Sequence, residues 1–87
     1  PVQNVRGGLA YLRWLLAYFR GDVALVAAAY NSGEGTVERY QGIPPYAETR
    51  AYVNRIKRFF RKDRHPYDPT VTDPSPELAR IRIMTVR

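Results

Sequence analysis

Eighty-seven residues form one small domain at most, and a formal net charge of +6 makes this domain strongly basic. The sequence has no cysteine and one histidine, which excludes a disulfide framework, a thiolate metal site and a histidine metal cluster. No apolar run is long enough for a membrane-spanning helix and no signal-peptide pattern is present, so we expect neither, and we expect no cofactor.

The first half of the chain predicts two helices. Asn4 can cap the first of them, which Gly21 ends and whose apolar residues recur at three- and four-residue steps. These apolar residues are Val5, Leu9, Leu12, Leu16 and Phe19. Asp22 is a good N-cap for a second helix over residues 23–30, which is apolar on almost every side and should therefore be buried.

The second half predicts two more helices. Gly33 and Gly35 break the chain before a short helix over residues 36–40, which Gly42 ends. Residues 43–46 contain two prolines and should be extended, because a residue that precedes proline is pushed out of the helical region. A last helix is predicted over residues 47–62. One face of it carries Thr49, Tyr52, Val53, Ile56 and Phe60.

Residues 63–87 differ in composition from the helical body. They hold four of the seven prolines, which predicts an extended Pro-rich tail. At its end, residues 81–87 alternate imperfectly between apolar and polar residues, and both a strand and a frayed turn fit this pattern. We therefore divide the chain into an all-helical body, residues 1–62, and a Pro-rich extension, residues 63–87.

Positive charge is concentrated near the end of the last predicted helix. Seven of the fourteen lysines and arginines lie between Arg50 and Arg64, where only Asp63 opposes them. Such a cluster attracts polyanions such as nucleic acid, anionic lipid or an acidic wall polymer. The alternative is a solvated helix face whose positive charges suit the helix C-terminus.

The stretch over residues 27–37 combines small apolar residues with a polar pair. Three alanines precede Tyr30 and Asn31, and two glycines follow within four residues. A phenol and a carboxamide therefore stand where an alanine-walled helix ends, which suggests a ligand groove. The alternative is a C-capped core helix with a buried tyrosine.

Residues 28–37 resemble the AAYNxGxGxV signature of the soluble lytic transglycosylase (SLT) domain in the lysozyme-like superfamily. Residues 43–44 and 48–53 are similar to the next block of that family, and residues 4–8 with 11–12 are similar to its preceding helix. Three blocks in the family's order cover residues 3 to about 60. The resemblance implies an all-α, lysozyme-like helical domain that cleaves bacterial peptidoglycan, in the bacterial cell envelope as a periplasmic or exported protein.

Part of the family pattern is not in the 87 residues. The catalytic residue of the family is a Glu in a Glu-Ser pair near the start of the domain, followed by a GLMQ-type segment. The resemblance therefore implies that the body is the C-terminal part of a catalytic domain. We expect the apolar helix over residues 23–30 to expose surface that the N-terminal half of the domain or self-association would cover, and the chain alone to be marginally stable, swapped or oligomeric.

The resemblance also implies a reaction. Lytic transglycosylases are expected to break the β-1,4 bond between N-acetylmuramic acid and N-acetylglucosamine without water, through one Glu that acts first as acid and then as base. The muramic acid C6 hydroxyl attacks C1 and closes a 1,6-anhydro ring, unlike the two-carboxylate scheme of most glycosidases.

By the same resemblance, Tyr30 would hydrogen-bond this Glu and orient it, and Asn31 would reach the sugar; a buried aromatic residue and a helix-end cap are the respective alternatives. Gly33 would serve backbone geometry and close approach to the glycan. Glu48 would lie in the substrate groove, unless it only complements the helix dipole. Tyr52 would line this groove or belong to the core.

Three other carboxylates of the body are candidates to replace the missing acid. Glu34 lies between two glycines and is expected to be exposed and flexible. Glu38 lies on a short polar helix, and Asp22 is better explained as a cap. None of them carries a feature that favours catalysis.

Two further functions stay open at this stage. The chain can be a non-catalytic, truncated lysozyme-like module that binds peptidoglycan or a protein partner without cleaving it. A weaker alternative uses the basic helix and its aromatic residues to bind nucleic acid or anionic lipid. No recognised nucleic-acid motif is present, so no nucleic-acid partner is expected.

Overall fold

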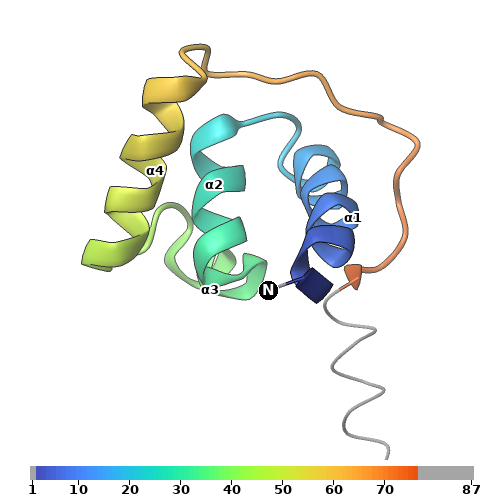
Figure 1. Ribbon diagram of the computed structural model, residues 1–87, viewed down its shortest axis with the longest axis horizontal. Coiled ribbons are helices and arrows are strands. Elements are labelled where there is room, and N and C mark those ends of the chain that lie inside the picture. Colours follow the sequence, from blue (N-terminus) through green and yellow to red (C-terminus); the bar gives the residue numbers. More distant parts are fainter. Residues whose placement is uncertain (1, 77–87) are drawn as a thin grey trace, which may run out of the picture.

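The computed structural model describes residues 2–76, with side chains from residue 8 onward. Four helices follow one another along this part of the chain (Figure 1): α1 (Val2–Tyr18), α2 (Val23–Ser32), α3 (Glu34–Tyr40) and α4 (Ala47–Phe59). The described residues contain no strand beyond one isolated bridge between Asp22 and Arg64. The all-helical prediction for the body is confirmed. None of the described helices is both long and apolar enough to cross a membrane.

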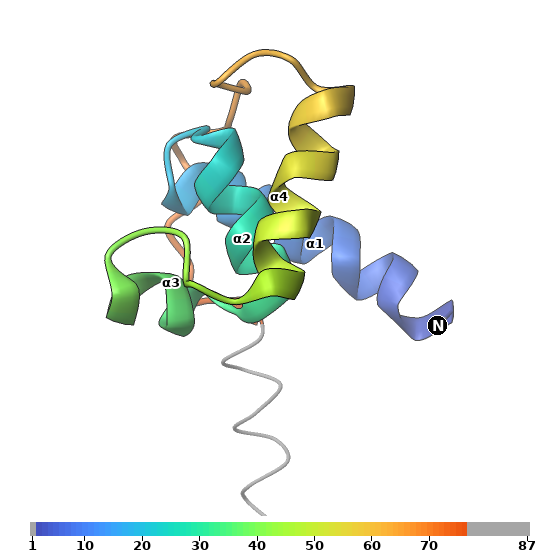
Figure 2. The same cartoon turned by 90° about the vertical axis from the view of Figure 1, so that its left-hand side faces the viewer.

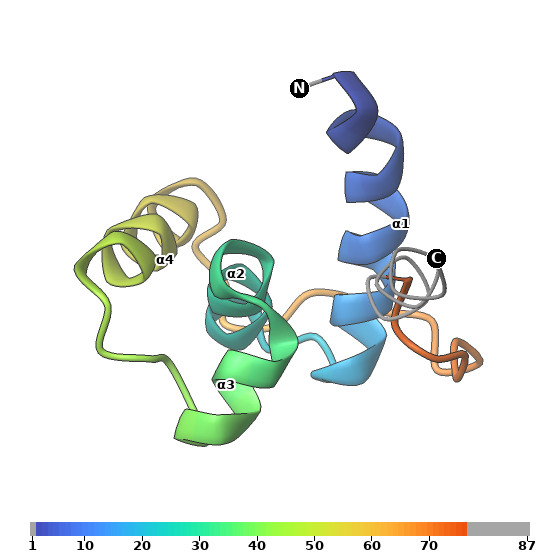
Figure 3. The same cartoon turned by 90° about the horizontal axis from the view of Figure 1, so that it is seen from below.

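Helix α2 is the centre of the fold. It lies between α1 and α4, and α3 packs against its C-terminal end (Figure 3). Asp22 caps it as predicted, because its carboxylate accepts a hydrogen bond of 3.2 Å from the Leu25 amide. Its buried residues are Val23, Val26, Ala27, Ala28 and Ala29. The expectation that this helix exposes its apolar surface is therefore wrong, since the chain's own helices cover it.

Helix α1 differs from its prediction at both ends and in its buried face. It begins at Val2, so Asn4 lies inside the first turn and does not cap it, and it ends at Tyr18, before Gly21. The buried residues are Tyr11, Trp14 and Leu15, because Tyr11 reaches α2 and α3 and Trp14 reaches a segment after α4. Of the predicted stripe, Leu9 is exposed, and Leu12, Leu16 and Phe19 are half-buried. The side chain of Val5 lies outside the described ones.

Helix α3 begins two residues before its prediction, so Gly35 lies inside it and does not break the chain. The joint between α2 and α3 is Gly33 alone, whose φ of +93° is a conformation that glycine adopts without strain. At the other end, Gln41 closes the helix with a φ of +54°. Residues 43–46 are non-helical, as predicted.

Helix α4 ends three residues before its prediction. After Phe59 the chain pairs with the start of α2: the Val23 amide donates to the Asp63 carbonyl over 3.0 Å, and the His65 amide donates to the Gly21 carbonyl over 2.8 Å. These tertiary hydrogen bonds replace the last helical turn. The predicted face of α4 is confirmed, with Thr49 and Val53 buried and the other three residues half-buried.

Residues 60–76 form a strap that leaves α4 and returns along α1 (Figure 1). The Trp14 indole Nε1 donates to the Asp73 carbonyl over 2.7 Å, and Arg13 pairs with Asp68 over 3.3 Å. Val71 packs against the core, which gives the strap an apolar anchor. The predicted strand or turn over residues 81–87 lies outside the described residues, and the division of the chain at residue 62 stays a prediction.

We expect Trp14→Phe to loosen the strap, because it removes the donor to Asp73 and keeps most of the apolar area. The loss of this hydrogen bond should cost about 1 kcal/mol and lower Tm by about 4–8 °C. Thermal unfolding by circular dichroism and limited proteolysis between residues 66 and 76 measure the effect. The matched control is Tyr67→Phe, whose hydroxyl has no hydrogen-bond partner in the described residues. Equal melting temperatures for both variants would contradict the assigned role.

Candidate functional site

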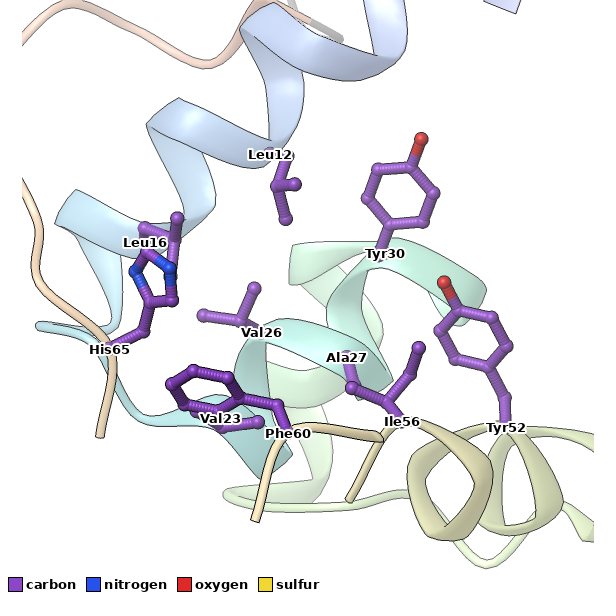
Figure 4. A pocket seen from close by; sticks show the side chains of 10 residues that line it. All are labelled: Leu12, Leu16, Val23, Val26, Ala27, Tyr30, Tyr52, Ile56, Phe60 and His65. Atoms are coloured by element: carbon purple, nitrogen blue, oxygen red, sulfur yellow. The ribbon is translucent and has the colours of Figure 1, made fainter. Parts of the chain in front are cut away.

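Three tyrosines from three helices form a row across the molecule. The Tyr30 ring, at the C-terminal end of α2, lies between Tyr11 of α1 and Tyr52 of α4, with ring centroids 5.9 and 6.5 Å away. The Tyr30 and Tyr52 rings are nearly parallel, at 9°, and Figure 4 shows them side by side. Tyr30 is 38 % exposed. We call these residues the tyrosine row.

Gly8 explains how the Tyr30 hydroxyl fits against α1. A Cβ atom at position 8 would lie 2.5 Å from the Tyr30 Oη atom, which is closer than any ordinary contact. A glycine inside a helix costs up to about 1 kcal/mol relative to alanine, and here it leaves the space that the phenol occupies. In the sequence, Gly8 belongs to the family block over residues 4–8, but the sequence indicates no role for it. Only the tertiary contact with Tyr30 reveals its role.

Tyr52 is held in its neutral form. Its side chain is half-buried, and this burial raises the pKa of the phenol above its ordinary 10.0. Tyr30 raises this pKa further, and the nearby Arg55 lowers it. Tyr52 is therefore a neutral hydrogen-bonding group at physiological pH.

An apolar pocket of about 380 Å³ extends from the tyrosine row. Figure 4 shows Tyr30 and Tyr52 at one end of it, and Phe60 with His65 at the other. Its remaining lining residues are Leu12, Leu16, Val23, Val26, Ala27 and Ile56. The predicted stripe of α1 thus lines this pocket in part, which explains why Leu12 and Leu16 are only half-buried.

Asn31 joins the end of α2 to the start of α4. The Thr49 hydroxyl donates to the Asn31 Oδ1 atom over 2.8 Å, and Thr49 is 1 % exposed. This partly buried hydrogen bond sets the direction of the Asn31 carboxamide, so Asn31 bridges two helices in addition to standing at a helix end. Sequence reasoning placed Thr49 on the core face of α4 and missed this contact.

The other two predicted site residues are Glu48 and Gly33. Glu48 is exposed in the first turn of α4, four residues before Tyr52, a spacing that puts both side chains on one side of the helix. Gly33 has open space where a Cβ atom would be. The structure therefore brings Tyr30 and Tyr52 together, joins Asn31 to Thr49 of α4, and places Glu48 one turn from Tyr52, while their functional roles stay predictions.

Tyr30 also lines a second hollow, of about 690 Å³, where α1 and α3 meet. Tyr11 donates its hydroxyl to Glu34 and Tyr18 donates its hydroxyl to Glu38, which raises the pKa of Tyr18. Glu34 is half-buried and hydrogen-bonded, so the expectation that it is exposed and flexible is wrong. Tyr11 and Tyr18 lie two turns apart on one face of α1, and Glu34 and Glu38 lie one turn apart on one face of α3. Nothing in either spacing predicts that the two faces meet.

The family model of the transglycosylase SLT domain matches residues 1–53. The chain belongs to this family. The match covers α1, α2, α3 and the first half of α4. It therefore includes all five residues that the sequence analysis assigned to the site: Tyr30, Asn31, Gly33, Glu48 and Tyr52. It confirms the all-α, lysozyme-like fold expected from the sequence motifs. The comparison with solved structures gives no match.

We expect Gly8→Ala to move the Tyr30 side chain while leaving the stability of the SLT domain nearly unchanged. The new methyl group should displace the Tyr30 hydroxyl, while the gain in helix propensity, up to about 1 kcal/mol, offsets the cost. Gly35→Ala is the matched control, because it is also a helical glycine but has nothing within 4 Å of the added Cβ atom. Shifts of the Tyr30 ring resonances in Gly8→Ala alone, at nearly unchanged Tm, are the expected result. Unshifted resonances would show that the contact does not constrain Tyr30.

The raised pKa of Tyr52 predicts a loss of stability in alkali. The folded protein holds this phenolic proton more tightly than the unfolded chain does, so the contribution to stability is complete below pH 10 and is lost as the pH rises through the raised pKa. We therefore expect the free energy of unfolding of the wild type to fall more steeply above pH 10.0 than that of Tyr52→Phe. Urea titrations at pH 8 and above measure it, and parallel curves would contradict the shift.

Proposed function

We propose that this protein is part of a peptidoglycan lytic transglycosylase, which cleaves the β-1,4 bond between N-acetylmuramic acid and N-acetylglucosamine and leaves a 1,6-anhydro end. Membership of the transglycosylase SLT domain family supports the class of reaction. The observation that carries the proposal is the partly exposed Tyr30, which lines an apolar pocket and whose hydroxyl lies beside Gly8. The proposed place of action is the bacterial cell envelope, in a periplasmic or exported protein.

The acid of this reaction is proposed to come from outside the 87 residues, on an additional segment or another chain. The Glu-Ser pair and the GLMQ-type segment of the family pattern are not in the sequence. Among residues 2–76, no carboxylate is hydrogen-bonded to the Tyr30 hydroxyl, and Glu34 and Glu38 are engaged by Tyr11 and Tyr18. These contacts support a structural role for both glutamates.

The tyrosine end of the pocket suits a single carboxylic acid. Apolar surface disfavours the ionised form and raises the pKa of a carboxyl group placed against it, as a proton donor near neutral pH requires. The Tyr30 phenol would hold this carboxyl group by a hydrogen bond and set its direction. The acid gives its proton to the leaving glycosidic oxygen, and the resulting carboxylate takes the proton of the C6 hydroxyl as that oxygen bonds to C1.

The neighbouring residues would bind the glycan. The Asn31 oxygen accepts from Thr49, which leaves the Nδ2 hydrogens as donors for an acetamido or hydroxyl oxygen of the sugar. Tyr52 would form one wall of the groove, and the exposed Glu48 would accept hydrogen bonds from sugar hydroxyls or stem-peptide groups. The open space at Gly33 would allow a sugar to approach the backbone.

Digestion of purified sacculi, with mass spectrometry of the products, tests the proposal. The protein together with the segment or chain that carries the acid, here called the full-length protein, should release fragments that have lost one water relative to hydrolytic products. The 87-residue chain alone should release none. Tyr30→Phe should lower the kcat of the full-length protein about 10- to 100-fold, with a smaller change in KM, because a misplaced acid slows the chemical step. Tyr40→Phe, an exposed tyrosine outside the row, is the control and should retain activity.

Three outcomes would contradict parts of this proposal. Hydrolytic products without anhydro ends would show a different reaction. Release of anhydro products by the 87-residue chain alone, abolished by Glu34→Gln, would place the acid in this chain. Binding of sacculi without any cleavage by the full-length protein would identify a non-catalytic peptidoglycan-binding module.

A further inference from the structure

The end of α4 and the first part of the strap form a strongly basic corner. We define the basic corner as residues 57–67 together with Arg20, which lies beside them. Figures 1 and 2 show this corner at one end of the molecule, beside the N-terminal end of α2, whereas α3 lies at the opposite end. The match to the SLT family ends at residue 53, so the corner lies almost wholly outside it.

The positive charges of the corner surround a hollow. Arg20, Lys62 and Arg64 line this hollow of about 670 Å³, together with uncharged side chains. The Arg64 guanidinium donates to the Arg20 carbonyl over 3.1 Å, which joins the strap to the turn after α1. The one acidic residue of the corner, Asp63, pairs with Lys57 over 3.6 Å. In residues 2–76 no carboxylate pairs with Arg20, Lys62 or Arg64, so a group of cations is available for an external anion.

The most exposed large apolar side chain of the described residues lies in the same corner. Phe59 is 84 % exposed, the highest value among the large apolar side chains of the described residues. Its neighbour Phe60 turns inward, packs on His65 at a centroid distance of 5.2 Å and lines the apolar pocket. The corner therefore combines a projecting apolar side chain, Phe59, with the arginines and lysines of residues 57–64.

We propose that the basic corner binds the surface of a bilayer that contains anionic phospholipids. Phe59 enters the boundary between headgroups and acyl chains, and the surrounding arginines and lysines contact lipid phosphates. Nucleic acid fits less well, because single strands are bound on rings of similar exposure that stack successive bases. In the corner one wholly apolar ring, Phe59, projects at 84 % exposure, and the other exposed ring, Tyr67, is 41 % exposed.

This docking also sets an orientation. The tyrosine row crosses α2 at Tyr30, near the C-terminal end of that helix. The basic corner adjoins the N-terminal end of α2 (Figures 1 and 2). A protein held by the corner therefore directs its tyrosine row away from the bilayer. The inference does not rest on the proposed function, because lipid binding is measured without glycan.

Sedimentation with phosphatidylcholine vesicles, with and without phosphatidylglycerol, tests the proposal. Binding should require phosphatidylglycerol and weaken in 1 M NaCl, where the Debye length falls to about 3 Å. Arg61→Ala should lower the partition coefficient about fivefold, and Phe59→Ala about tenfold. Arg39→Ala on α3 and Ile43→Ala just after α3 are the matched controls, an exposed arginine and an exposed apolar residue outside the corner, and both should bind like the wild type.

Phe59→Trp measures insertion directly. Its fluorescence should be quenched by brominated acyl chains, whereas the buried Trp14 of the wild type should not respond. Circular dichroism of every variant checks that the helices are intact. Two results would overturn the proposal: equal loss of vesicle binding in Arg61→Ala and Arg39→Ala, which indicates net charge alone, or an unquenched tryptophan at position 59. Tighter binding to duplex DNA than to anionic vesicles, unaffected by Phe59→Ala, would identify a nucleic-acid surface instead.

Discussion

The fold depends on the burial of helix α2 between α1 and α4. Ala27, Ala28 and Ala29 are at most 4 % exposed, and their small side chains allow three other helices to approach one axis. This close approach puts a tyrosine from each of α1, α2 and α4 into one row. It also limits the size of the core, because alanines bury little area. The strap supplies part of the missing cover through Val71 and the hydrogen bond from Trp14 to Asp73.

The same packing leaves one side of the centre incompletely filled. The apolar pocket runs along α2 from the tyrosine row to Phe60 and His65, and so connects the two ends of the molecule (Figure 4). Its tyrosine end has the exposed phenol and the dry wall that a proposed acid requires. Its other end adjoins the basic corner, where Phe60 turns inward and Phe59 turns outward. Of these two consecutive phenylalanines, Phe60 therefore lines the pocket and Phe59 projects from the surface.

Tyrosine–glutamate hydrogen bonds join α1 to α3. Tyr11 with Glu34 and Tyr18 with Glu38 fix the short helix against the longer one. Since α3 follows α2 through Gly33 alone, these bonds also hold the end of α2, where Tyr30 and Asn31 lie. The Thr49 bond to Asn31 restrains the same end from the side of α4. The candidate site is therefore positioned from both flanks by polar contacts.

The sequence by itself determined the helical class, the buried α2 with its Asp22 cap, the face of α4 and the SLT family, because these depend on local periodicity, capping chemistry and contiguous motifs. Tertiary structure alone decided the buried face of α1, the early end of α4, the engagement of Glu34 and the role of Gly8. Each of these is set by a partner at least 18 residues away along the chain, such as Ala29 for Tyr11. Local propensity carries no information about such partners, so only the packed helices reveal which side of α1 faces inward and why Tyr30 has room beside it.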